Sequence, residues 1–232
     1  MNLKLPEMVL IDVDGTLVDS VPDLHFCVNA MMEQLGMAAH SEAEVRKWVG
    51  NGVERLVKRA LIGTLDGEPD AALFDKALPI FLDLYTDNTC VRSLLYLGVQ
   101  EGLGFLKRAG FKLGCVTNKA AQFTEPLLKM LGIRDEFAIV VSGDTLPQKK
   151  PHPEPLLHAA RFFKVAPEDS LMLGDSVSDV TAARAAGFQI ICMSYGYNHG
   201  VDIRLAKPDA VIDSMAQLSD LLGGSEKKHA AG

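Results

Sequence analysis

The chain has 232 residues, of which 48% are hydrophobic and 23% are charged, and its formal net charge is −7 at pH 7. This is the balance of an ordinary globular protein, long enough for one large domain or for a domain with a smaller companion. The acidic charge argues against broad attraction to nucleic acid. No apolar run approaches the roughly 18 residues of a membrane-spanning helix, so we expect no membrane partner either.

No signal-peptide pattern accompanies the first apolar segment, which is short and already contains an aspartate. The cysteines are far apart and have no metal-binding spacing. We expect a cytoplasmic protein, active as a monomer or a homodimer, with reduced thiols at Cys27, Cys90, Cys115 and Cys192. Residues 224–232 show no apolar periodicity and predict a flexible tail.

The first predicted element is a buried strand over residues 8–13, because a short apolar, β-branched run is typical of parallel sheets. Helical patterns then follow over residues 21–36, 41–50, 51–63 and 69–88. Ser41 and Glu44 have the spacing of a capping box, which favours a helix start there, and Trp48 is expected in the core of these helices. This part of the chain interrupts the sheet and predicts a helical insertion.

Apolar runs predict further strands over residues 112–117, 137–142, 170–175, 189–194 and 209–213. The helical patterns between them end at Gly110, Gly132 and Gly187, and glycine is a frequent stop just past a helix. Alternating strands and helices predict an α/β fold with a Rossmann-like parallel sheet core. We assign that core to residues 1–17 and 91–223, and a helical cap domain inserted after the first strand to residues 18–90.

Polar residues follow the predicted strands at the edge where ligands bind in open α/β sheets. They are Asp12, Asp14, Thr117, Asn118, Lys149, Lys150, Asp175 and Asp179. Clustered carboxylates repel one another unless a cation joins them, and Mg²⁺ prefers oxygen ligands together with water and substrate phosphate. With lysine, threonine and asparagine nearby, the set suits phosphoryl transfer, in which a carboxylate can act as the nucleophile.

The segments DVDGTLVDS, VTNK, KKPHPEP and GDSVSD occur in this order and resemble the four motifs of the haloacid-dehalogenase superfamily of phosphohydrolases. The resemblance covers nearly the whole chain, and the helical insertion lies where that family has its mobile cap. It implies a Mg²⁺-dependent phosphatase that acts on a small phosphorylated substrate.

This resemblance implies a role for each matching residue. Asp12 would be the nucleophile that attacks phosphorus and forms an aspartyl-phosphate. Asp14 would protonate the leaving alcohol and then activate the water that hydrolyses the phospho-enzyme. Thr117 and Asn118 would bind the phosphoryl group, and Lys150 would steady both the nucleophile and the phosphate.

The resemblance also implies the metal ligands. Mg²⁺ would be held by Asp12, by the backbone carbonyl of Asp14 and by Asp175. Asp179 would support these ligands or bind the metal through water. Lys149 is interpreted as a solvated neighbour of the working lysine.

A finer resemblance, carried by WVGNGVERLVKRAL, LYLGVQEGL and GDTLPQKKPHPEPLLHA, is to the bacterial phosphoglycolate phosphatases. That family often has proline where this chain has Leu97, outside the catalytic motifs. The resemblance implies 2-phosphoglycolate as the substrate. Exposed N–H groups at a helix start can bind a carboxylate, so Gly50, Asn51, Gly52 and Arg55 are expected to contact it.

Alternative functions remain open at this point. The same machinery would serve a phosphatase or phosphomutase acting on another small phosphate ester, such as a sugar phosphate. A signalling receiver domain also gathers acidic residues, threonine and lysine on an α/β sheet, but the motif order and the helical insertion argue against it. Dehalogenase activity is disfavoured because the second acid that phosphate esters require, Asp14, is present.

Overall fold

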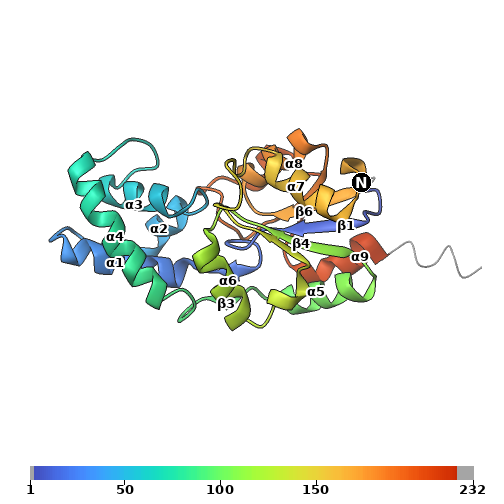
Figure 1. Cartoon of the computed structure of the whole chain (residues 1–232), viewed down its shortest axis with the longest axis horizontal. Helices are drawn as coiled ribbons and strands as arrows, with labels where there is room; N and C mark the ends of the chain where they lie inside the picture. The colour runs from blue at the N-terminus through green and yellow to red at the C-terminus, as the bar shows by residue number, and fades with distance from the viewer. Residues whose placement is uncertain (1–2, 224–232) are drawn as a thin grey trace, which may run out of the picture.

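The computed structural model describes residues 3–223, so the predicted tail over residues 224–232 lies outside the described part. A six-stranded parallel sheet forms the centre of the larger part of the molecule (Figure 1). In spatial order its strands are β5 (Ile139–Val141), β4 (Lys112–Val116), β1 (Met8–Ile11), β6 (Ser170–Gly174), β7 (Gln189–Met193) and β8 (Ala210–Ile212). The predicted α/β fold with a parallel sheet is confirmed, and each strand is one to three residues shorter than its predicted segment.

Helices cover both faces of the sheet (Figure 1), which explains the unbroken apolar run of β1. Val9 and Ile11 pack into one hydrophobic cluster, whereas Met8 and Leu10 pack into another on the opposite face. The first cluster includes residues of α5 (Val99–Arg108), α6 (Ala121–Met130) and α9 (Leu218–Leu222). The second includes residues of α7 (Glu154–Phe163) and α8 (Val177–Ala186).

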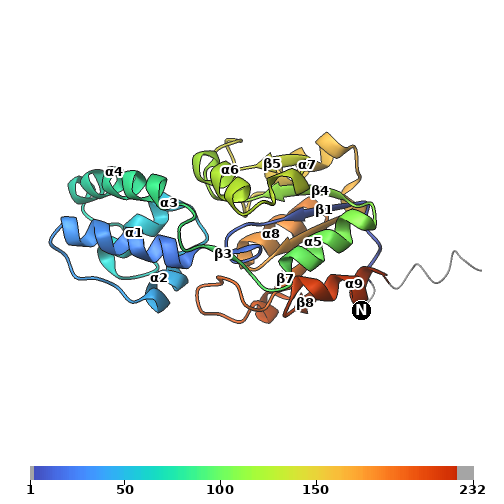
Figure 2. The ribbon, with the colours of Figure 1, turned by 90° about the horizontal axis from the view of Figure 1, so that it is seen from below.

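Four helices lie to one side of the sheet as a separate group (Figures 1 and 2): α1 (Val21–Gln34), α2 (Glu42–Trp48), α3 (Val53–Ile62) and α4 (Ala71–Asp87). We call them the helical group. They share a hydrophobic core in which Trp48 is buried, as predicted. The capping box of Ser41 and Glu44 is present at the start of α2.

A short antiparallel ribbon of β2 (Val18–Asp19) and β3 (Leu94–Leu95) joins the chain segments that enter and leave the helical group. The sequence did not predict this ribbon, because two residues per strand are too few to show a period. The domain limits that we assigned at residues 18 and 90 stay a prediction. Short 3₁₀ helices cover Arg134–Glu136, Pro167–Asp169, Ile203–Ala206 and Met215–Gln217.

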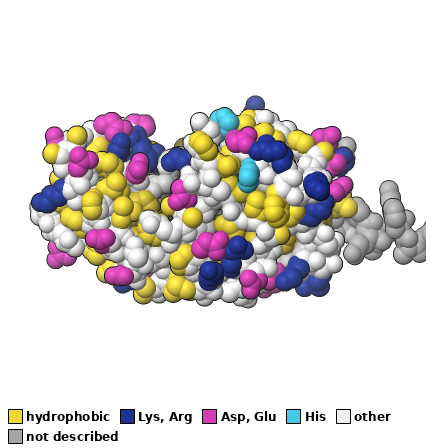
Figure 3. Space-filling view, viewed as in Figure 1, with side chains coloured by type: hydrophobic (Ala, Val, Ile, Leu, Met, Phe, Trp, Pro, Cys, Tyr) yellow, Lys and Arg dark blue, Asp and Glu magenta, His cyan; other side chains and the backbone are white. Residues whose placement is uncertain are grey.

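The cysteines are free thiols, and Cys27, Cys115 and Cys192 are buried. Within residues 3–223, none of the helices is both long and apolar enough to cross a membrane. Figure 3 shows acidic and basic side chains interspersed over one face rather than gathered by sign. This face therefore presents no large patch of positive charge that would attract an anionic ligand.

Candidate active site

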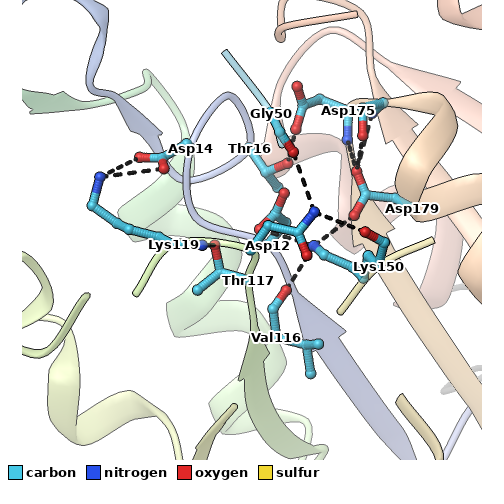
Figure 4. A network of polar contacts seen from close by, with 12 residues as sticks. Asp12, Asp14, Thr16, Gly50, Val116, Thr117, Lys119, Lys150, Asp175 and Asp179 are labelled. Carbon is cyan, nitrogen blue, oxygen red and sulfur yellow. Dashed lines mark hydrogen bonds and ion pairs between the residues drawn. The ribbon is translucent and has the colours of Figure 1, made fainter. Parts of the chain in front are cut away.

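The strand register brings the polar loop residues together. Ile11 at the end of β1 lies opposite Cys115 of β4 and Leu173 of β6, so the three strands end at nearly the same level. Asp12 and Asp175 follow β1 and β6 and so emerge at one edge of the sheet. Figure 4 shows their side chains around a common centre.

Three carboxylates converge at this edge. One oxygen from each of Asp12, Asp175 and Asp179 lies within 4.8 Å of the others. Burial raises the pKa of Asp12 to about 6. Burial also raises the pKa of Asp175 well above its ordinary value, and the charges of Asp179 and Asp12 add to that rise. The three buried carboxylates repel one another, and a bound cation would reduce this repulsion.

Lys150 supplies one positive charge to this cluster. Its Nζ lies 2.9 Å from Asp12 Oδ1 and donates hydrogen bonds to Asp179 Oδ1 at 2.7 Å and to the Val116 carbonyl at 2.8 Å. Burial lowers the pKa of this ammonium, but the charges of Asp12 and Asp179 outweigh burial and raise it. Lys150 therefore stays protonated although its side chain is only 2% exposed.

Lys149 is exposed, as expected of a solvated neighbour, but its Nζ also donates to the Asn51 carbonyl of the helical group at 3.3 Å.

Asp179 uses both carboxylate oxygens within the protein. Its Oδ1 accepts from Lys150, while its Oδ2 accepts from Ser176 Oγ at 2.7 Å and from the Ser176 N–H at 3.1 Å. The contacts with Ser176 form a capping box at the start of α8. Asp179 thus holds Lys150 and the loop that carries Asp175.

Asp12 and Asp175 differ in how their oxygens are satisfied. Asp175 accepts from Thr16 Oγ1 at 2.7 Å and from the Tyr197 N–H at 2.5 Å. Asp12 Oδ1 is buried and has no aligned hydrogen-bond donor within residues 3–223, although Lys150 lies close enough for an ion pair. A buried carboxylate oxygen without a donor is unfavourable, and it suits a bound cation.

Thr117 and Asn118 follow β4, and their side chains differ in their hydrogen-bond partners. Thr117 Oγ1 accepts from the Lys119 N–H at 3.2 Å, and within residues 3–223 no protein acceptor takes its hydroxyl proton. Asn118 Nδ2 donates to the carbonyls of Lys150 at 2.9 Å and of Gly50 at 3.2 Å. Thr117 therefore has a donor to offer a ligand, whereas the amide protons of Asn118 connect the sheet edge to the helical group.

Asp14 is turned toward Lys119, away from Lys150 and Asp179 (Figure 4). Lys119 Nζ donates to Asp14 Oδ1 at 3.1 Å and Oδ2 at 3.3 Å, and it also donates to the Tyr85 hydroxyl of α4. Burial lowers the pKa of Lys119, but the negative charge of Asp14 outweighs burial and raises it. The contact joins the sheet edge to the helical group through a buried cation.

A cavity of about 40 Å³ lies between the sheet edge and the helical group. The residues that line it are Asp12, Asp14, Thr117, Asn118 and Lys119 from the sheet edge, and Leu24, Val49, Gly50, Gly52, Val53, Leu56 and Tyr85 from the helical group. The structure thus brings Gly50 and Gly52 to the same cavity as the aspartates. Asn51 is not among its lining residues, and its carbonyl is engaged by Lys149.

Residues 6–187 match the family described as haloacid dehalogenase-like hydrolase. The chain belongs to the haloacid dehalogenase-like hydrolases. A relative from Nitrosococcus oceani, named phosphoglycolate phosphatase, is 67% identical over 220 residues, which are 95% of this chain and 98% of that protein. A relative of the same name from Nitrosospira multiformis is 47% identical, with 96% of this chain and 98% of that protein covered.

Solved structures of other proteins have a similar fold. A predicted phosphoglycolate phosphatase from Haemophilus somnus matches with a TM-score of 0.89 and 34% identity, covering 95% of this chain and 99% of that one. CbbY from Rhodobacter sphaeroides, solved in complex with xylulose-(1,5)bisphosphate, matches with a TM-score of 0.73 and 25% identity, covering 92% and 96%.

In this haloacid dehalogenase-like hydrolase, Arg55 is not part of the cavity wall. Its guanidinium donates to the Leu65 and Gly67 carbonyls, each at 3.1 Å, and to Glu68 at 3.0 Å. The acidic, carbonyl-rich turn after α3 therefore holds the side chain away from the aspartates. Arg55 thus lies outside the cavity wall in this structure, and its expected contact with the substrate stays a prediction.

The sequence interpretation of the hydrolase site missed Lys119 and Tyr85. Lys119 is the last residue of VTNK, directly after Thr117 and Asn118, so its place beside a strand end was a signal that we did not use. Tyr85 lies inside a long helical pattern, and nothing local distinguishes it from a core aromatic residue.

Proposed function

We propose that this chain is a Mg²⁺-dependent phosphatase that hydrolyses 2-phosphoglycolate to glycolate and phosphate through an aspartyl-phosphate. The observation that carries the proposal is the 67% identity, over nearly the whole of both chains, to a relative named phosphoglycolate phosphatase. The convergence of Asp12, Lys150 and Asp175 at one sheet edge supports the chemistry.

Asp12 is the proposed nucleophile. Its carboxylate oxygen attacks phosphorus while the bond from phosphorus to the glycolate oxygen breaks, and Asp14 donates a proton to that leaving oxygen. Asp14 then takes a proton from water, which attacks phosphorus and releases phosphate from Asp12. Lys150 supports the first step because it lies 2.9 Å from Asp12 and fixes the carboxylate.

The phosphoryl group requires donors and positive charge around its oxygens. The hydroxyl proton of Thr117 has no protein acceptor within residues 3–223, so it is available to a phosphoryl oxygen. Lys150 adds positive charge beside Asp12. We do not assign the Asn118 side chain to the phosphate, because its amide protons are already donated to Lys150 and Gly50 carbonyls.

The oxygen-rich donor set fits Mg²⁺, and the buried Asp12 Oδ1 without an aligned donor supports this. Asp12, the backbone carbonyl of Asp14 and Asp175 would hold the ion. When bound, Mg²⁺ would neutralise negative charge on the phosphoryl group and on the carboxylates. Asp179 would support these ligands, because both of its oxygens are engaged by Lys150 and Ser176.

We assign the core to residues 1–17 and 91–223 and propose that residues 18–90 act as a cap that closes over the substrate and excludes water. Hydrogen bonds from Asn118 to Gly50 and from Lys149 to Asn51 hold the cap loop against the sheet edge. The names of the bacterial relatives support a cytoplasmic enzyme that meets a small metabolite.

A second candidate is a phosphatase acting on a sugar phosphate, which the likeness to the CbbY complex with xylulose-(1,5)bisphosphate favours. Phosphate release from a panel of small esters, with and without Mg²⁺, separates the candidates. We expect 2-phosphoglycolate to give the highest kcat/KM, and excess chelator to abolish turnover. A sugar phosphate turned over faster than 2-phosphoglycolate would establish the second candidate and contradict the first.

A further inference from the structure

The wall of the cavity contains one cationic side chain, Lys119, among its lining residues within the described part of the chain. Facing it from the helical group is a largely apolar surface formed by Leu24, Val49, Val53 and Leu56. An organic anion that enters this cavity with its phosphate at Asp12 therefore finds its counter-charge at Lys119. Arg55, the cation that the sequence suggested for this purpose, is engaged elsewhere.

Lys119 donates its three N–H groups to Asp14 Oδ1, to Asp14 Oδ2 and to the Tyr85 hydroxyl, but its two contacts with Asp14 are long. Its distances to the two oxygens of Asp14 are 3.1 and 3.3 Å, longer than the roughly 2.7–2.9 Å of strong charge-assisted hydrogen bonds. The Asp14 carboxylate thus uses N–H groups of Lys119 that a second carboxylate can share. An ammonium has three N–H donors, and Asp14 needs only one of them to remain paired.

Tyr85 provides a second donor at the same place. Its side chain is fully buried, and its hydroxyl accepts a hydrogen bond from Lys119 Nζ. No group within residues 3–223 accepts the proton of that hydroxyl. A buried phenol donor without an acceptor is unfavourable, and an anionic ligand in the adjoining cavity would satisfy it.

We propose that Lys119 and Tyr85 form the subsite for the substrate carboxylate, at the end of the molecule opposite the phosphate. The inference rests on the proposed phosphatase function and names the residues that select its substrate. One N–H of Lys119 and the O–H of Tyr85 donate to the carboxylate, while Asp14 keeps another N–H. Because Tyr85 lies on α4 and Lys119 lies beside β4, the subsite is complete only when the cap is against the sheet edge.

The subsite gives the enzyme a physical basis for rejecting neutral esters. A buried site that pairs a cation with a charged group loses much of its binding free energy when the ligand carries no charge at that end. An ester that ends in a hydroxymethyl group leaves the subsite cation without its second partner. The preference for a carboxylate therefore depends on Lys119 and Tyr85 and not on the groups that hold the phosphate.

The test compares two esters that share the scissile bond and differ only at the far end, 2-phosphoglycolate and 2-hydroxyethyl phosphate. The readout is the ratio of their kcat/KM values. Lys119→Met should lower this ratio by about 100-fold, because a buried charge pair is lost. Tyr85→Phe should lower it by about 5- to 10-fold, because one hydrogen bond is lost. Lys129→Met, at an exposed lysine near the end of α6 and outside the cavity wall, should leave the ratio unchanged.

A binding measurement accompanies the kinetics and does not depend on turnover. In an Asp12→Asn background, calorimetric titration of the two esters should give the same loss of preference for 2-phosphoglycolate when Lys119→Met is added. Circular dichroism establishes that each variant is folded. If Lys119→Met does not fold, Tyr85→Phe decides, and an unchanged ratio in that variant overturns the subsite.

The outcomes also separate the subsite from the proposed function. If the unmodified enzyme prefers 2-phosphoglycolate and folded Lys119→Met slows both esters equally, Lys119 serves only the phosphate or Asp14, and the subsite is wrong. If the unmodified enzyme releases phosphate from neither ester in the presence of Mg²⁺, the proposed function fails and the subsite fails with it.

Discussion

The Lys150 ammonium lies 2.9 Å from a carboxylate oxygen of Asp12, and only 2% of the lysine side chain is exposed. This contact and the ion pair with Asp179 place a buried cation beside two of the three converging carboxylates. Removing one partner of a buried ion pair leaves the other charge buried and unpaired. The loss of stability is then typically larger than the stability that the intact pair contributed. The lysine is therefore expected to matter for stability as well as for activity.

Lys150→Met should abolish phosphatase activity and lower the free energy of unfolding by about 3–5 kcal/mol, because Asp12 and Asp179 lose their shared counter-ion. Urea denaturation monitored by circular dichroism measures the second effect. Lys149→Met is the matched control, since that side chain is exposed and its loss should change the free energy of unfolding by about 0.5 kcal/mol or less. Equal stability of the two variants would contradict the structural role of Lys150.

The raised pKa of Asp12 predicts a pH-dependent stability in the metal-free protein. Burial, opposed by Lys150, raises that pKa to about 6 from its ordinary value of 3.8. Between these values the folded state binds a proton that the unfolded state does not, so the free energy of unfolding falls as pH rises through this window. The fall from this group is at most about 3 kcal/mol, because each pKa unit corresponds to about 1.4 kcal/mol.

Asp12→Asn removes this titration and also the proposed nucleophile. With chelator present, the stability of the variant relative to the unmodified protein should therefore be greater at pH 7.5 than at pH 4, while turnover is abolished at both. Urea denaturation at the two pH values measures the difference. A stability difference that does not change with pH would show that Asp12 has an ordinary pKa in the folded protein.

The residues at the strand ends were predictable because their placement follows from local patterns and topology. Asp12 and Asp175 directly follow apolar runs, and parallel pairing of β1 with β6 brings the ends of both runs to one level. The contact between Lys119 and Tyr85 was not predictable in this way. It joins positions 34 residues apart, and it depends on how α4 packs against the sheet edge.

Arg55 is another residue whose side-chain position could not be predicted. Its place one turn into the helix after Gly52 suggested a substrate contact, but a helix start fixes only the backbone direction. The side chain instead meets the turn at residues 65–68, where two carbonyls and Glu68 accept its protons. A sequence pattern does not reveal such competing acceptors, because they come into reach only through the turn that follows α3.

Mg²⁺ should stabilise the protein through the carboxylates that would hold it. At a concentration of about 100 times Kd, a ligand that binds only the folded state adds about 2.7 kcal/mol, which raises Tm by about 5–10 °C in a chain of this size. Asp175→Asn should remove most of this shift because it removes a proposed ligand. Asp75→Asn, at an exposed position of α4, should retain it. A full shift in Asp175→Asn would exclude Asp175 from the metal site.

Gly15 sets the spacing between the Asp12–Asp14 loop and Asp175. Its φ is +88°, and a Cβ added there would lie 2.3 Å from Asp175 Oδ2, closer than non-bonded atoms can approach. Gly15→Ala should therefore displace the Asp175 carboxylate, reduce activity at least about 100-fold, and weaken Mg²⁺ binding, in addition to the backbone strain of about 1 kcal/mol that alanine incurs at positive φ.

Gly36→Ala is the matched control for that prediction. Gly36 also has a positive φ, +68°, but a Cβ added there would meet no atom within 4 Å. It should show the same backbone strain and a similar loss of stability from that source, with kcat/KM for 2-phosphoglycolate unchanged. Kinetics and Mg²⁺ titrations on both variants separate the two effects of the substitution. Equal activity in the two alanine variants would mean that Asp175 tolerates displacement, and the metal assignment would lose its main geometric support.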